Sequence, residues 1–179
     1  LLGQILTRLG RKGEAYKAFG RAGRSAQSDY AMQFNARIRQ SEVYQGDNIE
    51  PEVKALRRMV RYDRNAEYLD QIYYAIGNLY LSRRDTTEAM ANYRLAVSKS
   101  TREGYDKALA NLALGNLYFD QHRYDLAQPC IAEAVPQLPE DFPGLDSLRM
   151  RSDVLDELST YAQNVHLQDS LLALPALSP

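Results

Sequence analysis

The tetrapeptide Gly-Asn-Leu-Tyr occurs twice in this 179-residue chain, at residues 77–80 and 115–118. The longer stretches around it, 75–97 and 113–135, carry small and large apolar residues in nearly the same order. A period in the thirties is typical of helical repeats, in which each unit is a helix pair that buries its apolar face only against its neighbours. This repetition predicts a stack of antiparallel helix pairs.

The rest of the chain fits the same fold class. Apolar residues recur at helical spacing, and no alternating run reaches the length of a strand. We expect breaks between helices at residues 10–13, 45–48, 83–85, 121–123 and 136–144. Asp85 is the expected N-cap of a helix and Pro51 suits the first turn of another, whereas Pro129 predicts a kink or a late helix start. No apolar run is long enough to span a membrane.

Four positions align as one column of small residues: Gly3, Ser41, Gly77 and Gly115. They divide one repeat domain, residues 1–179, into units of about 1–28, 29–65, 66–101 and 102–140. We expect a degenerate helix pair at 144–174, made of helices 146–164 and 165–174, to cover the end of the stack. Its burial face would hold Leu171, Leu172 and Leu174, and residues 175–179 would be disordered or continue into further sequence.

The column indicates close helix crossings. We expect Gly77 to pack against Ala89 and Gly115 against Ala127, because small residues let two helices approach. Large side chains would fill the hollows between them, namely Tyr80, Tyr93, Tyr118 and Ile131. The chain starts at Leu1 without a methionine, which favours a fragment with further repeats before it.

Charge is distributed unevenly. Residues 1–64 carry 13 basic and 7 acidic side chains, whereas the remainder carries 9 and 16. Five basic residues fall at spacings that place most of them on one helix face: Lys54, Arg57, Arg58, Arg61 and Arg64. This face is either solvated or a docking patch for a protein. Because no stacking or groove-reading motif accompanies it, we do not expect nucleic acid to bind.

No catalytic constellation is present in the sequence. His122 and His166 have no partners at metal-ligand spacing, so we expect no metal site and no cofactor. We interpret His122 as a surface turn residue and Cys130, the one cysteine, as a small half-buried residue. No disulfide can form within the chain. The sequence therefore predicts a protein that is not an enzyme.

The spacing Leu114-Gly115-x-x-Tyr118, then Ala127-x-x-x-Ile131, resembles the tetratricopeptide repeat, as do the related spacings in residues 1–139. The resemblance implies an all-α, right-handed α-α superhelix that works as a scaffold for a protein or peptide. Its partner would lie in the groove formed by the first helix of each unit. In the third unit the groove positions are Gln71, Tyr74, Asn78 and Leu81. In the fourth they are Leu109, Leu112, Asn116 and Phe119, and in the second Asn35, Ile38 and Glu42.

Some tetratricopeptide grooves clamp a terminal carboxylate with Lys and Asn side chains. Here Tyr74 and Leu112 occupy the Lys place, and Ala75 and Ala113 occupy that of the second Asn. The resemblance therefore does not imply a carboxylate clamp.

Residues 50–175 also resemble the tetratricopeptide lipoproteins of Bacteroidetes, the PorW/SprE type associated with gliding motility and type IX secretion. The runs 67–81 and 108–128 carry this similarity. It implies an adaptor in the cell envelope, facing the periplasm at the outer membrane and held by a lipid anchor outside this chain. Two other readings stay open: a regulatory domain that senses a ligand or peptide, and a passive spacer between domains.

Overall fold

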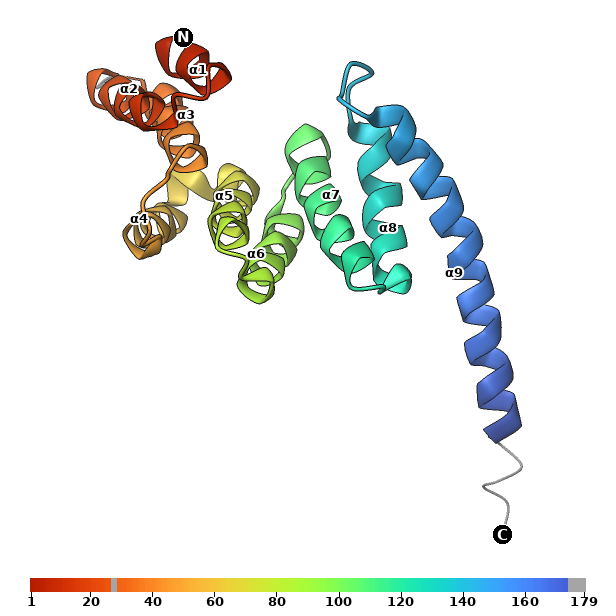
Figure 1. Ribbon diagram of the computed structural model, residues 1–179. Helices are drawn as coiled ribbons and strands as arrows, with labels where there is room; N and C mark the ends of the chain where they lie inside the picture. Colours follow the sequence, from red (N-terminus) through yellow and green to blue (C-terminus); the bar gives the residue numbers. More distant parts are fainter. Residues whose placement is uncertain (27–28, 174–179) are drawn as a thin grey trace. The chain divides into compact units, whose positions relative to one another are not determined.

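The computed structural model describes residues 1–26 and 29–173, and those residues form an all-α helical-repeat fold without strands, as predicted. Antiparallel helices follow one another along the chain (Figure 1). The helices are α1 (Leu2–Arg8), α2 (Lys12–Ser25), α3 (Tyr30–Glu42), α4 (Glu50–Val60), α5 (Leu69–Ser82), α6 (Thr86–Lys99), α7 (Tyr105–Asp120), α8 (Tyr124–Ala134) and α9 (Leu145–Ala173). Two 3-10 helices, η1 (Asp63–Tyr68) and η2 (Val135–Gln137), complete the order.

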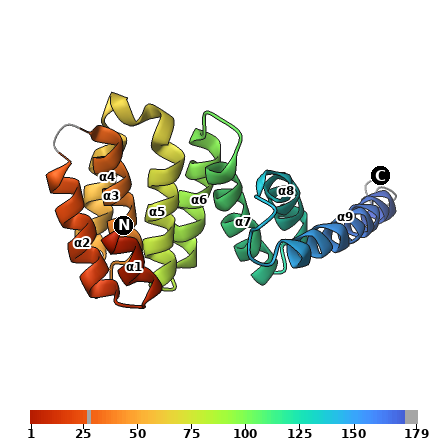
Figure 2. The same cartoon turned by 90° about the horizontal axis from the view of Figure 1, so that it is seen from above.

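The chain divides into two compact units, Leu1–Thr101 with α1 to α6 and Arg102–Pro179 with α7 to α9. The division falls at the boundary that the sequence predicts between its third and fourth repeats. Within the first unit α5 pairs with α6, α2 packs on both α1 and α3, and α3 and α4 each contact α5. Within the second unit α8 lies between α7 and α9 (Figure 2).

The turns inside the helix pairs repeat as well. Gly10, Arg84 and His122 each follow a column glycine by seven residues, and all three adopt the left-handed backbone conformation, with φ of 73°, 60° and 58°. This conformation reverses the chain after a helix and is easiest for glycine. The side chain of Asp85 then accepts a hydrogen bond from the Glu88 amide at 3.0 Å, which confirms the predicted N-cap.

Glycine lets the two helices of a pair approach closely. A Cβ atom on Gly77 would lie 2.5 Å from Cε1 of Tyr93, and one on Gly3 would lie 2.6 Å from Cε1 of Phe19. On Gly115 it would lie 2.8 Å from Cγ1 of Ile131. The side chain nearest to Gly77 is thus Tyr93 rather than the expected Ala89, although Ala89 is also buried.

The second repeat departs from this pattern. Its column residue is Ser41, whose hydroxyl donates to the Ile38 carbonyl at 2.7 Å, and residues 43–49 form a longer connection between α3 and α4. The apolar side chains of both helices instead join α5 in one core, which holds Phe34, Ile38, Val53, Leu56, Ile72 and Ile76. Pro51 lies in the first turn of α4, as predicted.

The second half of the chain differs from expectation in two places. Helix α8 begins at Tyr124 and continues through Pro129, so the late start is wrong, while the alternative of a kink at Pro129 stays a prediction. Residues 145–173 form the single helix α9 instead of the predicted pair 146–164 and 165–174. That stretch contains neither Gly nor Pro, so nothing in its sequence interrupts the helix. The expected burial of Leu171 and Leu172 concerns side chains outside the described part, and Leu174 and 175–179 also lie outside it.

The Gly77→Ala substitution should destabilise the first unit, because the added methyl group overlaps the buried ring of Tyr93. We expect a loss of about 1–3 kcal/mol, as for other overpacked cores. Gly13→Ala is the matched control: Gly13 is also helical, and a Cβ there meets nothing within 4 Å. Urea unfolding followed by circular dichroism measures both. Equal stability of the two variants would contradict the close-contact role of Gly77.

Candidate functional site: the first-helix face

The residue after each column position marks a common side of the first helices: Gln4 on α1, Glu42 on α3, Asn78 on α5 and Asn116 on α7. We call these residues and their neighbours one turn away the first-helix face, considered separately in each unit. On α5, the carbonyl oxygen of the Asn78 side chain accepts a hydrogen bond of 2.7 Å from the hydroxyl of Tyr93. Burial raises the pKa of Tyr93 above its ordinary value, which favours the protonated hydroxyl that donates this bond.

The other predicted positions on α5 surround Asn78. Gln71 and Tyr74 are half-buried, and the ring of Tyr74 packs on that of Tyr93 with centroids 5.7 Å apart. Leu81 is exposed to 38%. Tyr93 on α6 therefore holds Tyr74 and Asn78 in place through these two contacts. Leu81, at the end of the face, is exposed to solvent.

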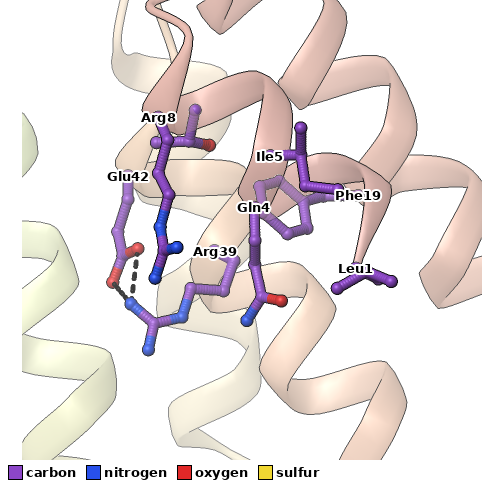
Figure 3. Close-up of a pocket in the computed structure, with 8 residues that line it drawn as sticks. Leu1, Gln4, Ile5, Arg8, Phe19, Arg39 and Glu42 are labelled. Carbon is purple, nitrogen blue, oxygen red and sulfur yellow. Dashed lines mark hydrogen bonds and ion pairs between the residues drawn. The ribbon is translucent and has the colours of Figure 1, made fainter.

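A pocket of about 350 Å³ lies on the same face between α1 and α3 (Figure 3). Its apolar wall includes Ile5 and Phe19, and its polar wall includes Gln4, Arg8, Arg39 and Glu42. Figure 3 shows Arg8 beside the ion pair that Arg39 forms with Glu42 at 3.0 Å.

The sequence pattern did not predict this pocket. In the other repeats a groove position directly follows the column residue. The same rule applied to Gly3 gives Gln4, so the sequence spacing could have identified the groove position on α1. Of the second-repeat positions that the sequence assigned to the groove, Glu42 lines the pocket and Asn35 is exposed. Ile38 is wrong as a groove residue, because it is 8% exposed and packs in the core with Val53 and Ile72.

The corresponding side of α7 is contacted by α9. The Arg151 guanidinium donates to the side-chain oxygen of Asn116 at 2.9 Å and lies 5.1 Å from the centre of the Phe119 ring. Leu112 is buried in a cluster with Leu145 and Leu148, so it is wrong as a groove residue. Leu109 is half-buried. In the second unit, the chain itself contacts most of the residues that the sequence offered to a partner.

Four of the five basic residues predicted to form a patch lie on α4 or at its end, and the fifth does not. Lys54, Arg57 and Arg58 lie on α4, but the helix ends at Val60, Arg61 is its C-cap, and Arg64 lies in η1. All five are exposed. The guanidinium of Arg64 packs 4.0 Å from the centre of the Tyr30 ring, which holds it against α3. Arg64 is therefore separated from the helix that carries the other members of the predicted patch.

A polar network holds α2, α3 and α4 together behind the pocket. The buried Glu52 carboxylate accepts a hydrogen bond from the Tyr16 hydroxyl at 2.5 Å. It also forms an ion pair with the Arg37 guanidinium at 2.5 Å. The Gln40 side chain links Arg37 to the backbone carbonyl of Tyr16. Burial, together with the hydrogen bond to Glu52, raises the pKa of Tyr16 to about 12.

The described residues contain no group of three or more His, Cys, Asp and Glu side chains placed to hold a metal ion. His122 is exposed in its turn, 3.1 Å from the Tyr124 hydroxyl, and Cys130 is half-buried, as interpreted from the sequence. Within the part of the chain that the structure describes, no helix has the length and hydrophobicity to cross a bilayer.

Comparison with protein families finds a tetratricopeptide repeat at residues 70–98, which corresponds to α5 and α6. No curated protein matches the chain significantly. The matched pair contains the Gly77–Tyr93 contact and the Asn78 position described above. Tetratricopeptide repeats generally mediate protein–protein interaction, and their fold is typically a non-catalytic scaffold.

The Tyr16 hydroxyl makes stability fall at high pH. Its pKa of about 12 in the folded protein lies above the ordinary 10.0, so the hydroxyl favours the folded state fully below pH 10. Between pH 10 and 12 the unfolded chain loses this proton first, and that contribution disappears. We expect the free energy of unfolding of the Tyr16→Phe variant to fall less steeply with pH over this range than that of the wild type, as measured by chemical unfolding.

Tyr62→Phe is the control for this measurement, because Tyr62 is 49% exposed in the same unit. It should keep the wild-type slope. A Tyr16→Phe variant with an unchanged slope would show that the Tyr16 proton is not held by the fold.

Proposed function

We propose that this chain is a non-enzymatic scaffold that binds a segment of a protein partner along the first-helix face of the unit Leu1–Thr101. One observation carries the proposal: the pocket between α1 and α3 is lined by Gln4 and Glu42, which occupy the repeat position of Asn78. A pocket and a line of amide side chains on one face suit an extended peptide, whose side chains enter hollows and whose backbone pairs with amides.

The partner's chemistry follows from the lining. Arg8 and Arg39 face one carboxylate, Glu42, so the polar wall carries net positive charge next to Ile5 and Phe19. An anchor side chain with an apolar stem and an acidic or amide end would satisfy both walls. Leu81, at the far end of the face, offers an apolar contact.

The second unit contributes to the same function less directly. Asn116 and Phe119 are proposed contacts only for a partner that displaces the Arg151 side chain from them. Arg151 donates a hydrogen bond to Asn116 and packs on the ring of Phe119. Lys54, Arg57, Arg58 and Arg61 remain a proposed second docking patch, since all are exposed on or just after α4.

The pathway in this proposal is an adaptor role in envelope machinery of the secretion and gliding type, and only the resemblance to Bacteroidetes lipoproteins supports it. The family match covers residues 70–98 and carries no pathway. Sensing of a peptide and passive spacing are the alternative functions, and the following experiment separates them from scaffolding.

Photo-crosslinking at Leu81 tests where the partner binds. Leu81 on α5 and Leu95 on α6 are each 38% exposed, so a benzoylphenylalanine at either position is equally accessible. We expect the probe at Leu81, but not at Leu95, to capture a protein from fractionated extracts of the producing cell. Capture from the membrane fraction would support the envelope role.

Substitution of Gln4 by Arg, with the probe kept at Leu81, should abolish that capture without changing the melting temperature, because Gln4 is exposed. Equal capture from Leu81 and Leu95 would contradict the first-helix face as the binding site. No capture from either position would favour the spacer, and capture of a small peptide alone would favour sensing.

A further inference from the structure

Among the side chains of α9 that the structure describes, apolar residues form two faces, of which one is buried and the other exposed. Leu145, Leu148 and Leu155 are buried on the side that packs on α8, and the first two join the cluster around Leu112. On another side, four large apolar residues are 62%, 54%, 41% and 68% exposed: Met150, Val154, Leu158 and Tyr161. We call these four residues the α9 stripe.

The α9 stripe has the spacing of a packed helix face. Its members follow one another by four, four and three residues, so they lie within about 80° of the helix circumference at 3.6 residues per turn. Helix α9 has 29 residues and α8 has 11, and Figures 1 and 2 both show α9 continuing well past α8. A second helix therefore has room to lie along the stripe.

The charges beside the α9 stripe are asymmetric. Asp153 and Glu157 are exposed and stand one turn apart along one edge. Asp146, further along this edge, lies 3.5 Å from Arg149, which also pairs with Glu140. The other edge carries Arg151, which is directed toward Asn116 and Phe119 on α7. The available edge is therefore acidic.

The acidic edge of the α9 stripe determines which kind of helix can pack on it favourably. Two copies of α9 packed antiparallel through their stripes would place Asp153 and Glu157 of one copy against the same edge of the other, and like charges at such an edge repel. A helix that carries Lys or Arg beside its apolar residues meets the acidic edge favourably. We propose that the α9 stripe docks a basic amphipathic helix of a protein partner.

The test uses the whole chain and two labelled synthetic helices in fluorescence anisotropy. Both peptides carry Leu at spacings of four, four and three, one flanked by Lys and the other by Glu. We expect the Lys peptide to bind at least about tenfold more tightly, an advantage that decreases at high salt. The Asp153→Lys, Glu157→Lys variant should reverse the preference.

Substitution of Val154 and Leu158 by Ser should weaken binding of the Lys peptide about tenfold or more, whereas Met32→Ser should not, because Met32 is an apolar residue, 53% exposed, that lies on α3 and not on the α9 stripe. The proposal is overturned if the Lys peptide binds the Val154→Ser, Leu158→Ser variant as tightly as wild type. It is equally overturned if both peptides bind alike, or if sedimentation shows a dimer that this variant dissociates, because a second copy would then cover the stripe.

Discussion

The structure depends on one recurring contact, in which a glycine of a first helix faces a large side chain of the second. Gly77 faces Tyr93, Gly115 faces Ile131 and Gly3 faces Phe19. Without a side chain on the glycine the two helices come close enough for the large residue to be fully enclosed, and Tyr93 and Ile131 have no exposed surface. The same contact extends to the candidate site, since the Tyr93 hydroxyl donates a hydrogen bond to the side-chain oxygen of Asn78. Tyr93 therefore links the packing of the helix pair to the proposed binding face.

The repeats, the helix pairing and the small-residue column could be predicted from sequence because they depend on local spacing. The αL turns at Arg84 and His122 fall in the predicted breaks, and Asp85 caps α6 as its sequence indicates. The second repeat was predicted less well. Ser41 carries a Cβ, so α3 and α4 do not meet as the other pairs do, and Ile38 turns into the shared core with α5. The end of α4 at Val60 likewise separates Arg64 from the basic residues before it.

Long-range contacts account for what the sequence did not reveal about the site. The groove positions on α7 were assigned from spacing alone, but Leu112 packs on Leu145 and Leu148, and Arg151 contacts Asn116 and Phe119. No local sequence pattern in α7 predicts that a helix 30 or more residues away in the chain will cover its first-helix face. The pocket between α1 and α3 has the same origin, because Arg39 and Glu42 meet Gln4 and Arg8 only in the folded unit. Helix α9 thus closes one surface and, through the α9 stripe, presents another.

Hydrogen exchange of the whole chain, with and without the protein captured through Leu81, tests the central claim most directly. If the first-helix face binds the partner, amides of α1, α3 and α5 gain protection on addition of the partner, while those of α2, α4 and α6 keep their rates. Side-chain contact on one face shields the helices that form it and lowers their opening. Protection confined to α4, or to α9 alone, would contradict the account and move the binding site to the basic residues or to the α9 stripe.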